Sequence, residues 1–259
     1  MRPLKTRLLS EKDLRHLLLP EDYLSCMESA FRAHGRGEIS LPQKTYLVLP
    51  GRGDFRAMPA FLSTPARCGI KWVNVHTQNR HRGLPTVMGL VILNDPDNGF
   101  PLAVMDGTFI TKMRTGAAGA LAAKCLARRD ASILGLVGCG VQAEAQLFFL
   151  SKLFPLRRVK FWGLTEEDRR RFLRRLRSYK FPIEPKGTVR EAVSEADLVV
   201  TTTPSCRPLV RRAWIREGTH INASGADAKG KQELDPTLLK SAILIVDDRD
   251  QACESGEMN

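Results

Sequence analysis

A glycine motif lies where an apolar run gives way to a helix-like pattern. Residues 133–137 are apolar, and Gly138-Cys-Gly140-Val-Gln-Ala143 follows them directly. This is the G-x-G-x-x-A form of the dinucleotide fingerprint, in which the first glycine permits a tight turn and the second lets the backbone approach a pyrophosphate. The N–H groups of Val141 and Gln142 would open the helix towards the phosphates. A chance turn is the alternative, but the strand–turn–helix setting favours a site for NAD or NADP.

The carboxylate that usually accompanies this fingerprint is missing. In NAD-binding sites an acidic residue about 20 positions further on holds the ribose hydroxyls. Counting from Ala143 reaches Gly163-Leu-Thr165, which contains no acid. Thr165 and the nearby Arg169 could instead accept a 2′-phosphate. We therefore expect a weak or reversed preference for NAD over NADP, and we expect Gly163→Asp to shift the balance towards NAD.

Three charged residues have unusual places in the sequence and side chains that can bind an anion or move a proton. Arg114 begins an alanine-rich stretch, and its guanidinium can bind a carboxylate through two hydrogen bonds. Lys71 interrupts an apolar strand between Ile70 and Trp72. Asp227 follows a predicted strand, at the edge where ligands of open α/β sheets bind. Each residue also has an ordinary interpretation, as a surface arginine, a solvent-facing lysine or a turn aspartate.

The composition argues against several other classes of protein. Of the 259 residues, 43% are hydrophobic and 26% are charged, which is typical of a globular chain. No apolar run approaches the roughly 18 residues of a membrane span, and the first residues lack the cleavage site of a signal peptide. The six cysteines form no C-x-x-C pair, and the histidines form no grouping with carboxylates, so we expect no metal site. We expect a cytoplasmic protein.

The net charge of +12 raises the question of a nucleic-acid partner. Much of the excess lies between residues 169 and 177, where six arginines alternate with Phe172, Leu173 and Leu176 at helical spacing. Such spacing favours the solvated face of an amphipathic helix over a nucleic-acid surface. We therefore predict no nucleic-acid partner and no membrane partner.

Two halves of different pattern must position these residues. Residues 1–120 predict helices and a mostly antiparallel sheet, with helices at 10–17 and 21–35 and strands at 45–49, 56–62, 69–75 and 86–93. An alanine-rich helix over 108–127 leads into the second half. Residues 121–259 alternate strands and helices, with strands at 132–137, 159–162, 181–184, 198–202, 220–223 and 243–246 and helices at 141–153, 166–179, 188–195 and 235–240. The alternation predicts an α/β fold: a doubly wound parallel Rossmann sheet beside an α+β domain.

Several stretches, taken together and in order, carry a resemblance that covers nearly the whole chain. They are Gly69-Ile-Lys71-Trp-Val, Leu84-Pro-Thr86, Met105-Asp-Gly-Thr108, Arg114-Thr-Gly-Ala-Ala118, the glycine motif, Thr201-Thr-Thr-Pro204, residues 218–227 and residues 230–235. In these stretches the sequence resembles the ornithine cyclodeaminase / mu-crystallin family, most closely its archaeal-type alanine dehydrogenase branch. The resemblance implies an α+β domain for substrate binding and dimerisation, a Rossmann domain, a homodimer, and a nicotinamide cofactor.

The resemblance also assigns roles to individual residues. It implies Lys71 and Asp227 as the catalytic acid–base pair, and it implies Arg114, Lys44 and Arg56 as substrate contacts. The implied cofactor cleft is lined by Gly138, Gly140, Val141, Gln142, Thr86, Arg114, Thr115, Gly163, Leu164, Thr165, Thr203, Ser224 and Lys231.

The function that follows is reversible oxidative deamination of a small L-amino acid, first of all L-alanine, to a 2-oxo acid and ammonia. Alternatives are an ornithine cyclodeaminase, a ketimine or pyrroline-carboxylate reductase, and a mu-crystallin-like protein that binds NADP and a ligand without turnover. A cyclodeaminase needs an acid for the distal amine, and the segment Asp54-Phe-Arg56 offers arginine near the corresponding position. Presence of both Lys71 and Asp227 favours an enzyme over a binding protein.

The ending of the sequence carries one further expectation. Relatives continue for several dozen residues past the equivalent of Gly256-Glu257, and residues 247–259 are polar. We expect these residues to form no terminal element, and we expect the return segment to be missing. Without that segment, the stripe of Ile110, Met113, Ala117 and Leu121 is predicted to be exposed.

Overall fold

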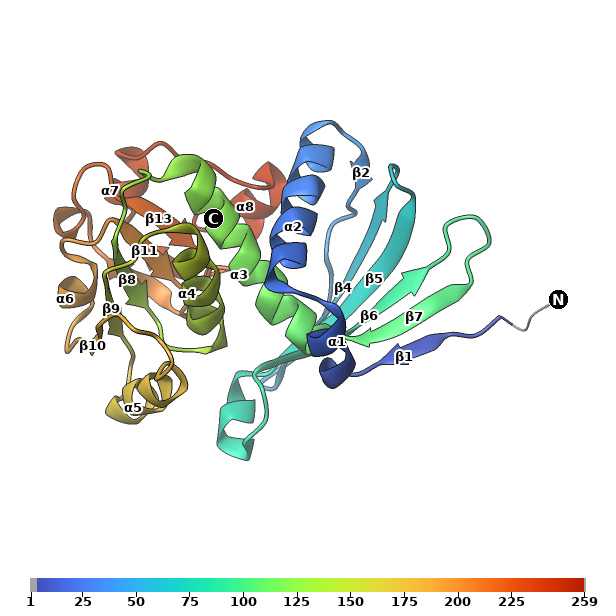
Figure 1. The fold of residues 1–259 in the computed structure, drawn as a ribbon, viewed down its shortest axis with the longest axis horizontal. Coiled ribbons are helices and arrows are strands. Elements are labelled where there is room, and N and C mark those ends of the chain that lie inside the picture. Colours follow the sequence, from blue (N-terminus) through green and yellow to red (C-terminus); the bar gives the residue numbers. More distant parts are fainter. Residues whose placement is uncertain (1–3, 259) are drawn as a thin grey trace. The chain divides into compact units, whose positions relative to one another are not determined.

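The computed structural model describes residues 4–258 and divides the chain into two compact units, Met1–Arg114 and Thr115–Asn259 (Figure 1). The first unit is an α+β fold and the second is a parallel α/β fold, so the predicted fold class is confirmed. The division after Arg114 and the predicted boundary at residue 120 both fall within one helix, α3 (Gly107–Leu126).

The first unit is built on one seven-stranded sheet. Its strand order is β1-β7-β6-β5-β4-β2, with β3 also paired to β4, and every pair is antiparallel except β1 with β7. Strands β3 (Thr45–Leu49), β4 (Gly53–Leu62), β5 (Arg67–Val75) and β6 (Val87–Asn94) confirm the four predicted runs. Three further strands of this unit were not predicted: β1 (Arg7–Leu9), β2 (Ile39–Ser40) and β7 (Pro101–Asp106).

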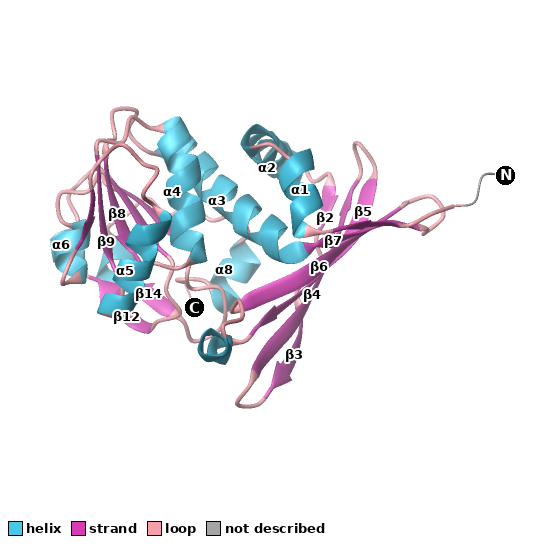
Figure 2. Cartoon of the chain, turned by 60° about the horizontal axis from the view of Figure 1, so that its bottom comes forward, coloured by secondary structure: helices cyan, strands magenta, loops and turns pink. Residues whose placement is uncertain are grey.

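Within the described part of the first unit, helices lie on one face of this sheet and the other face carries none (Figure 2). Helix α1 (Glu11–Leu17) begins at a capping box, in which the Ser10 hydroxyl accepts the Asp13 N–H and the Asp13 carboxylate accepts the Ser10 N–H. Helix α2 (Pro20–Gly35) follows, and a short 3-10 helix, η1 (Thr77–Arg82), joins β5 to β6. The predicted helices at 10–17 and 21–35 are confirmed.

The predicted exposed stripe on α3 is not present. Ala117 and Leu121 are buried, and Ile110 and Met113 are half-buried. Glycines on α3 allow this helix to pack closely against the backbone of neighbouring elements in each unit. A Cβ on Gly107 would lie 2.7 Å from the Gly89 carbonyl carbon in the first unit, and a Cβ on Gly116 would lie 2.7 Å from the Ala145 backbone in the second.

The second unit contains a five-stranded parallel sheet of order β10-β9-β8-β11-β13. Its strands are β8 (Ile133–Val137), β9 (Arg158–Trp162), β10 (Ile183–Pro185), β11 (Leu198–Thr201) and β13 (His220–Ala223). The connecting helices are α4 (Val141–Leu153), α5 (Glu166–Arg175) and α6 (Val189–Val193), and α7 (Pro236–Lys240) follows the last strand. A separate parallel pair, β12 (Cys206–Val210) and β14 (Gln232–Leu234), and the 3-10 turn η2 (Arg212–Trp214) complete the unit's middle part.

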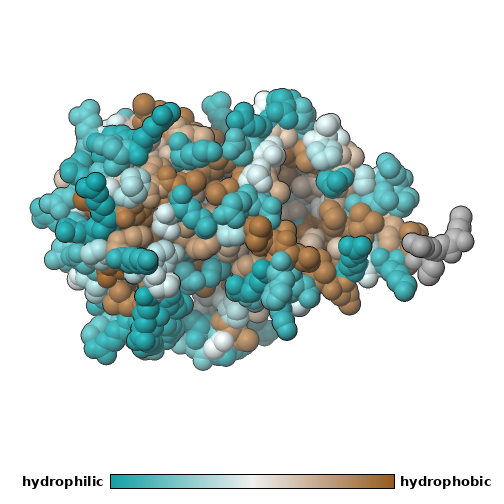
Figure 3. All heavy atoms as spheres, viewed as in Figure 1, coloured by the Kyte–Doolittle hydropathy of each residue, from teal (hydrophilic) through white to brown (hydrophobic). Residues whose placement is uncertain are grey.

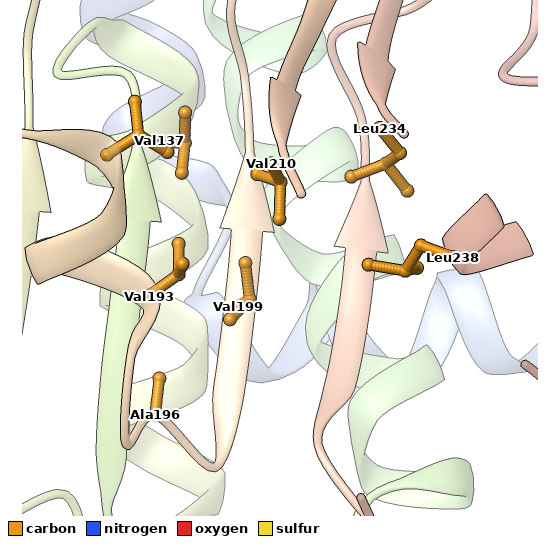
Figure 4. Close-up of a cluster of buried hydrophobic side chains, with 8 residues drawn as sticks. Val137, Val193, Ala196, Val199, Val210, Leu234 and Leu238 are labelled. Carbon is orange, nitrogen blue, oxygen red and sulfur yellow. The ribbon is translucent and has the colours of Figure 1, made fainter. Parts of the chain in front are cut away.

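The apolar core of this unit lies between the sheet and its helices (Figure 4). Val137 and Val199 from the sheet, Val193 from α6, and Val210 and Leu234 from the β12–β14 pair are all buried in one cluster. On the outside, α5 shows the predicted solvated arginine face: Phe172 is buried, while Arg170 pairs with Glu166 and Arg171 with Glu167. Hydrophilic side chains gather over this helix in Figure 3.

Two expectations about the last residues are wrong. Residues 243–246 form no strand; their four apolar side chains are exposed, and Ile243 is 93% exposed. The segment is apolar enough to look like a strand, but it pairs with no neighbour, so β13 remains the last strand of the described sheet. The polar tail does form an element, α8 (Arg249–Ser255), which begins where the Asp248 carboxylate accepts the Gln251 N–H.

Candidate functional site

The turn from β8 to α4 has the geometry that a pyrophosphate needs. Gly138 has φ +110°, and a Cβ there would lie 2.6 Å from the Thr202 hydroxyl oxygen. Gly140 precedes α4 with no side-chain cap and with open space around its α-carbon. The first N–H groups of the helix are therefore left for an anion, which the helix dipole also favours. Ala143 is fully buried, as close helix–strand packing requires.

Polar atoms from three other places gather around this turn. The register Val137↔Thr201↔Ala223 brings the ends of β8, β11 and β13 to one edge of the sheet, and Thr202 and Ser224 follow there. The hydroxyl of Thr202, the hydroxyl of Thr115 and the side-chain carbonyl of Gln142 are buried without a hydrogen-bond partner within residues 4–258. Buried polar atoms normally have partners, so this edge fits a polar ligand such as a dinucleotide.

A buried acid that the sequence analysis missed holds the loops at this edge. Glu233, on β14, is fully buried, and its carboxylate accepts the Thr203 N–H at 2.6 Å, the Thr203 hydroxyl at 2.7 Å and the Gly225 N–H at 2.9 Å. Burial raises the pKa of Glu233, against these hydrogen bonds, which lower it. The hydroxyl of Thr203, a predicted cofactor residue, therefore donates its hydrogen bond to Glu233. The neighbouring Thr202 hydroxyl has no partner in the described residues, so it is the better candidate for a ligand contact.

Two further polar side chains support the same edge. Gln146, fully buried on α4, donates to the Thr115 carbonyl at 3.3 Å and to the Ser224 hydroxyl at 3.5 Å. Glu257, after α8, accepts the backbone N–H groups of Glu233 and Leu234. In the sequence, the only sign of Glu233 is that it belongs to the family-like stretch 230–235. The sequence around a single glutamate or glutamine does not show which groups it will bind.

The predicted acid–base residue Asp227 lies in the loop after β13. Its carboxylate forms an ion pair with Lys231, which the sequence analysis placed in the cofactor cleft. The Asp227 side chain is 45% exposed and that of Lys231 is 19% exposed. The loop therefore joins two of the predicted site residues directly.

The end of β9 is occupied by an arginine and a thiol. Arg169 donates from Nη1 to the Gly163 carbonyl at 2.6 Å, and a Cβ on Gly163 would lie 2.3 Å from the Cys139 sulfur and 3.2 Å from the Arg169 Cγ. Burial raises the pKa of the Cys139 thiol to about 11. Thr165 caps α5, because its hydroxyl accepts the Asp168 N–H at 3.1 Å. The expected Gly163→Asp experiment is therefore a poor one, since the new side chain would displace Cys139.

In the first unit, sheet register places the predicted cationic residues on one face. Lys71 on β5 lies opposite Met58 and Val91, and Arg56 on β4 lies opposite Val73. Paired residues share a face of the sheet, which places Arg56 on the side of buried Val73. Lys71 lies two residues before Val73 on the same strand, so it is on that side too. Lys44 immediately precedes β3, whose Tyr46 lies opposite Arg56.

Arg56 is buried against a carboxylate. It donates from Nε to the Asp54 carboxylate at 2.7 Å and from Nη2 at 3.3 Å, and its guanidinium lies 5.2 Å from the centre of the Tyr46 ring. Asp54, the acid nearest to the position that a cyclodeaminase would need, is thus bound to Arg56. Two further predicted residues belong to this unit: Thr86, whose carbonyl accepts the His76 N–H at 2.8 Å, and the half-buried Arg114 on α3.

The described residues contain no group of three or more possible metal ligands. No helix between residues 4 and 258 is both long and apolar enough to cross a membrane.

Comparison with known proteins gives consistent matches along the chain. The model of the ornithine cyclodeaminase/mu-crystallin family matches residues 5–259. Alanine dehydrogenase of Archaeoglobus fulgidus is 45% identical over 258 residues, which are 99% of this chain and 78% of that protein. The ketimine reductase mu-crystallin of Rattus norvegicus is 34% identical over 224 residues, which are 86% of this chain and 71% of that protein.

Two solved structures share the fold closely. An archaeal alanine dehydrogenase dimer with bound NAD has a TM-score of 0.91 and 45% identity, covering 98% of this chain and 78% of that one. The Δ1-pyrroline-2-carboxylate reductase of Thermococcus litoralis, in complex with NADH and L-proline, has a TM-score of 0.94 and 33% identity, covering 98% and 79%.

Proposed function

The chain belongs to the ornithine cyclodeaminase/mu-crystallin family, and from this premise we propose that it oxidatively deaminates a small L-amino acid, L-alanine first of all. It is an NAD(P)-dependent enzyme of that family. In the proposed reaction an L-amino acid, water and oxidised cofactor give a 2-oxo acid, ammonium and reduced cofactor, with release of a proton. The cofactor, when bound, takes the hydride from Cα.

The second unit supplies the cofactor site in this proposal. The open N-terminus of α4, after Gly138 and Gly140, binds the pyrophosphate. The unpartnered hydroxyls of Thr115 and Thr202 are hydrogen-bond donors for the same ligand. Glu233 and Gln146 keep the surrounding loops in place without contacting the reacting atoms.

The first unit supplies the substrate contacts. Arg114 and Lys44 bind the substrate carboxylate, because guanidinium and ammonium groups form charge-assisted hydrogen bonds to it. Lys71 takes and returns protons at the substrate nitrogen and at the water that attacks the imine, and Asp227 acts as the second acid–base group. Each of these roles is carried over from the family resemblance.

One observation in the first unit favours a short substrate over ornithine. Asp54 is the acid nearest to the place where a distal ammonium would need a partner, and its carboxylate already accepts two hydrogen bonds from buried Arg56. A substrate with a second ammonium would have to compete with that ion pair. Alanine has no such group.

A reductase of cyclic imines is the second candidate. It is favoured by the similarity to the structure of a Δ1-pyrroline-2-carboxylate reductase. The same lysine and arginines would serve it, because a cyclic imine acid also carries a carboxylate and accepts hydride and a proton at its C=N bond.

We also propose that the enzyme is a homodimer that pairs through the uncovered face of the first unit's sheet. This face presents exposed large apolar side chains, among them Trp72 at 39% and Leu90 at 48%. The other members of this face are Leu8, Leu47, Phe61 and Leu102. Contiguous exposed apolar patches of this kind mark protein interfaces. A solved relative at 45% identity is a dimer.

The deciding experiment follows nicotinamide absorbance with a substrate panel. L-alanine, L-ornithine, pyruvate with ammonia, and Δ1-pyrroline-2-carboxylate are each supplied with NAD(H) and with NADP(H). The proposal requires the highest kcat/KM with L-alanine and with pyruvate plus ammonia. Preferential reduction of the cyclic imine would instead establish the second candidate, and cofactor binding without any turnover would contradict both and favour a binding protein.

A further inference from the structure

We propose that Arg169 forms a binding site for the 2′-phosphate of NADP at the end of β9, so that the chain prefers phosphorylated adenosine ligands. This inference rests on the proposed dinucleotide site in the second unit. It does not depend on which amino acid is oxidised.

The first supporting observation is that a glycine packed against Cys139 stands where an acid is usual. Sites that select NAD place a carboxylate at the end of the second strand, where it binds the ribose hydroxyls and repels a 2′-phosphate. Here that strand is β9, and Gly163 follows it. A Cβ at Gly163 would lie 2.3 Å from the Cys139 sulfur, so a side chain at this position would have to displace the neighbouring thiol.

The second observation is the placement of Arg169. Its Nη1 donates to the Gly163 carbonyl at 2.6 Å, which fixes the guanidinium over the end of the strand. A guanidinium has five N–H donors, and within residues 4–258 the Arg169 side chain makes no hydrogen bond other than the one to the Gly163 carbonyl. The remaining donors suit a phosphate, which guanidinium groups bind through paired hydrogen bonds.

The third observation is that three arginines on α5 form ion pairs with acids, whereas Arg169, like Arg174, forms none within residues 4–258. Arg170 pairs with Glu166, Arg171 with Glu167, and Arg175 with Glu144. These pairs belong to the solvated face of the helix and to its contact with α4. Arg169 alone of these four lies against the strand end without a carboxylate partner in the described part of the chain.

The surroundings are cationic and open. A pocket of about 400 Å³ lies between α5 and the end of β10, and its lining includes Arg169, Arg170 and Lys186 beside a single carboxylate, that of Glu166. Glu166 is paired with Arg170, and Lys186 with Glu184 at 2.6 Å. Their charges are therefore largely balanced, and the net attraction for a phosphate falls to Arg169.

The test measures binding rather than turnover. Titration calorimetry on the full chain compares adenosine 2′,5′-bisphosphate with 5′-AMP, and NADP with NAD. Because hydrogen bonds between charged groups are stronger than neutral ones, we expect the 2′-phosphate to tighten binding about tenfold or more, equivalent to about 1.4 kcal/mol. Arg169→Gln should remove this gain and leave the affinity for 5′-AMP unchanged.

Two more variants separate Arg169 from the general charge of the helix. Arg171→Gln removes the same charge from a residue paired with Glu167, and it should leave the tenfold gain intact. Leu164→Asp places a carboxylate next to the strand end at a residue that is 72% exposed, without the clash at Gly163, and it should weaken binding of the 2′-phosphate ligands only.

Three outcomes would overturn the inference. One is equal affinity of the wild-type chain for adenosine 2′,5′-bisphosphate and 5′-AMP, another is retention of the gain in Arg169→Gln, and the third is a preference for NAD of more than about a hundredfold, or roughly 2.7 kcal/mol. In each case continued NAD binding would leave the dinucleotide site standing. Selective binding of NADP by a chain that turns over no amino acid would support the inference while contradicting the proposed reaction.

Discussion

The two units hold their functional side chains in different ways. In the first unit, Lys71 and Arg56 are carried by strands, and the register of a long antiparallel ladder decides which face they occupy. In the second unit, Thr202, Ser224 and Asp227 lie in loops after parallel strands. Those loops are held by buried polar groups, above all Glu233.

This difference teaches where each kind of substitution should act. Changing a functional side chain on a strand leaves the ladder's backbone hydrogen bonds intact, so its effect should be confined to the chemistry. Changing a buried acid that holds loops leaves N–H groups without partners, so its effect should appear first in stability and ligand binding.

The largest expected effect is on turnover. Lys71→Met should lower kcat about a thousandfold, within the range for loss of a general acid–base group, and should change the affinity for the nicotinamide cofactor by less than about twofold. Steady-state kinetics and calorimetry measure the two quantities. Lys12→Met, on the exposed surface of α1, is the matched control and should behave as wild type. Near-native kcat in Lys71→Met would show that the strand lysine is not the proton carrier.

Next comes the loop support in the second unit. Glu233→Ala should lower the free energy of unfolding by about 3 kcal/mol, because it leaves the Thr203 and Gly225 N–H groups buried without an acceptor, and it should also weaken cofactor binding. Chemical denaturation and calorimetry provide the readouts. Glu217→Ala, at an exposed turn, should change stability by less than about 0.5 kcal/mol. If both variants were equally stable, Glu233 would have no supporting role.

The uncovered face of the first unit's sheet gives a third prediction. Trp72→Lys should raise the dimer dissociation constant about a hundredfold, equivalent to about 2.7 kcal/mol, because it places an unpaired charge in the proposed interface. Sedimentation measures the change. Lys12→Glu, which also alters an exposed charge of this unit, should leave the mass unchanged. A monomeric wild-type chain, or a dimer indifferent to Trp72→Lys, would rule this face out.

The smallest effect concerns pH. Burial raises the pKa of Glu257 above its ordinary value of 4.5, against the hydrogen bonds from Leu234 and Glu233 that lower it. The folded chain therefore holds this proton more tightly than the unfolded chain does. That stabilisation is complete below the unfolded pKa and is lost as pH rises through the folded pKa.

Since glutamine does not titrate, Glu257→Gln isolates this contribution. The stability of the wild type minus that of the variant should fall as pH rises from about 4 to about 7. Thermal unfolding of both proteins across that range provides the measurement. Glu233 keeps its carboxyl in both proteins, but the Glu257 charge is one cause of its raised pKa, so the variant also brings the pKa of Glu233 closer to its ordinary value. This coupling changes the difference in the same direction. A difference that grows with pH would contradict the assignment.

Local pattern was sufficient for much of the fold. The extended run 45–49 and the helical run 141–153 match β3 and α4 residue for residue, because residue types and turn signals near each element are enough to indicate it. Residues 243–246 show the limit of this reasoning. Their apolar run is as strand-like as that of β8, but a strand exists only when a neighbour pairs with it, and no local pattern reveals that partner.

In the candidate site, too, local features could be predicted from the sequence and contacts between distant residues could not. The glycine turn could be predicted because its backbone conformation demands glycine at Gly138. The role of Glu233 could not, because its partners lie 30 residues upstream at Thr203 and 8 residues upstream at Gly225. The obstruction of Gly163 by Cys139 is likewise a contact between two loops, so the sequence suggested a substitution that the structure makes unsuitable.

The thiol at the centre of the glycine turn has a consequence for redox chemistry. With its pKa raised to about 11, only about one Cys139 in ten thousand is a thiolate at pH 7, and the thiolate is the form that oxidants and alkylating reagents attack. Cys26, Cys125, Cys206 and Cys253 are exposed by comparison. Oxidative damage or covalent labelling should therefore accumulate at these peripheral cysteines and spare the phosphate turn, which makes them convenient positions for spectroscopic probes.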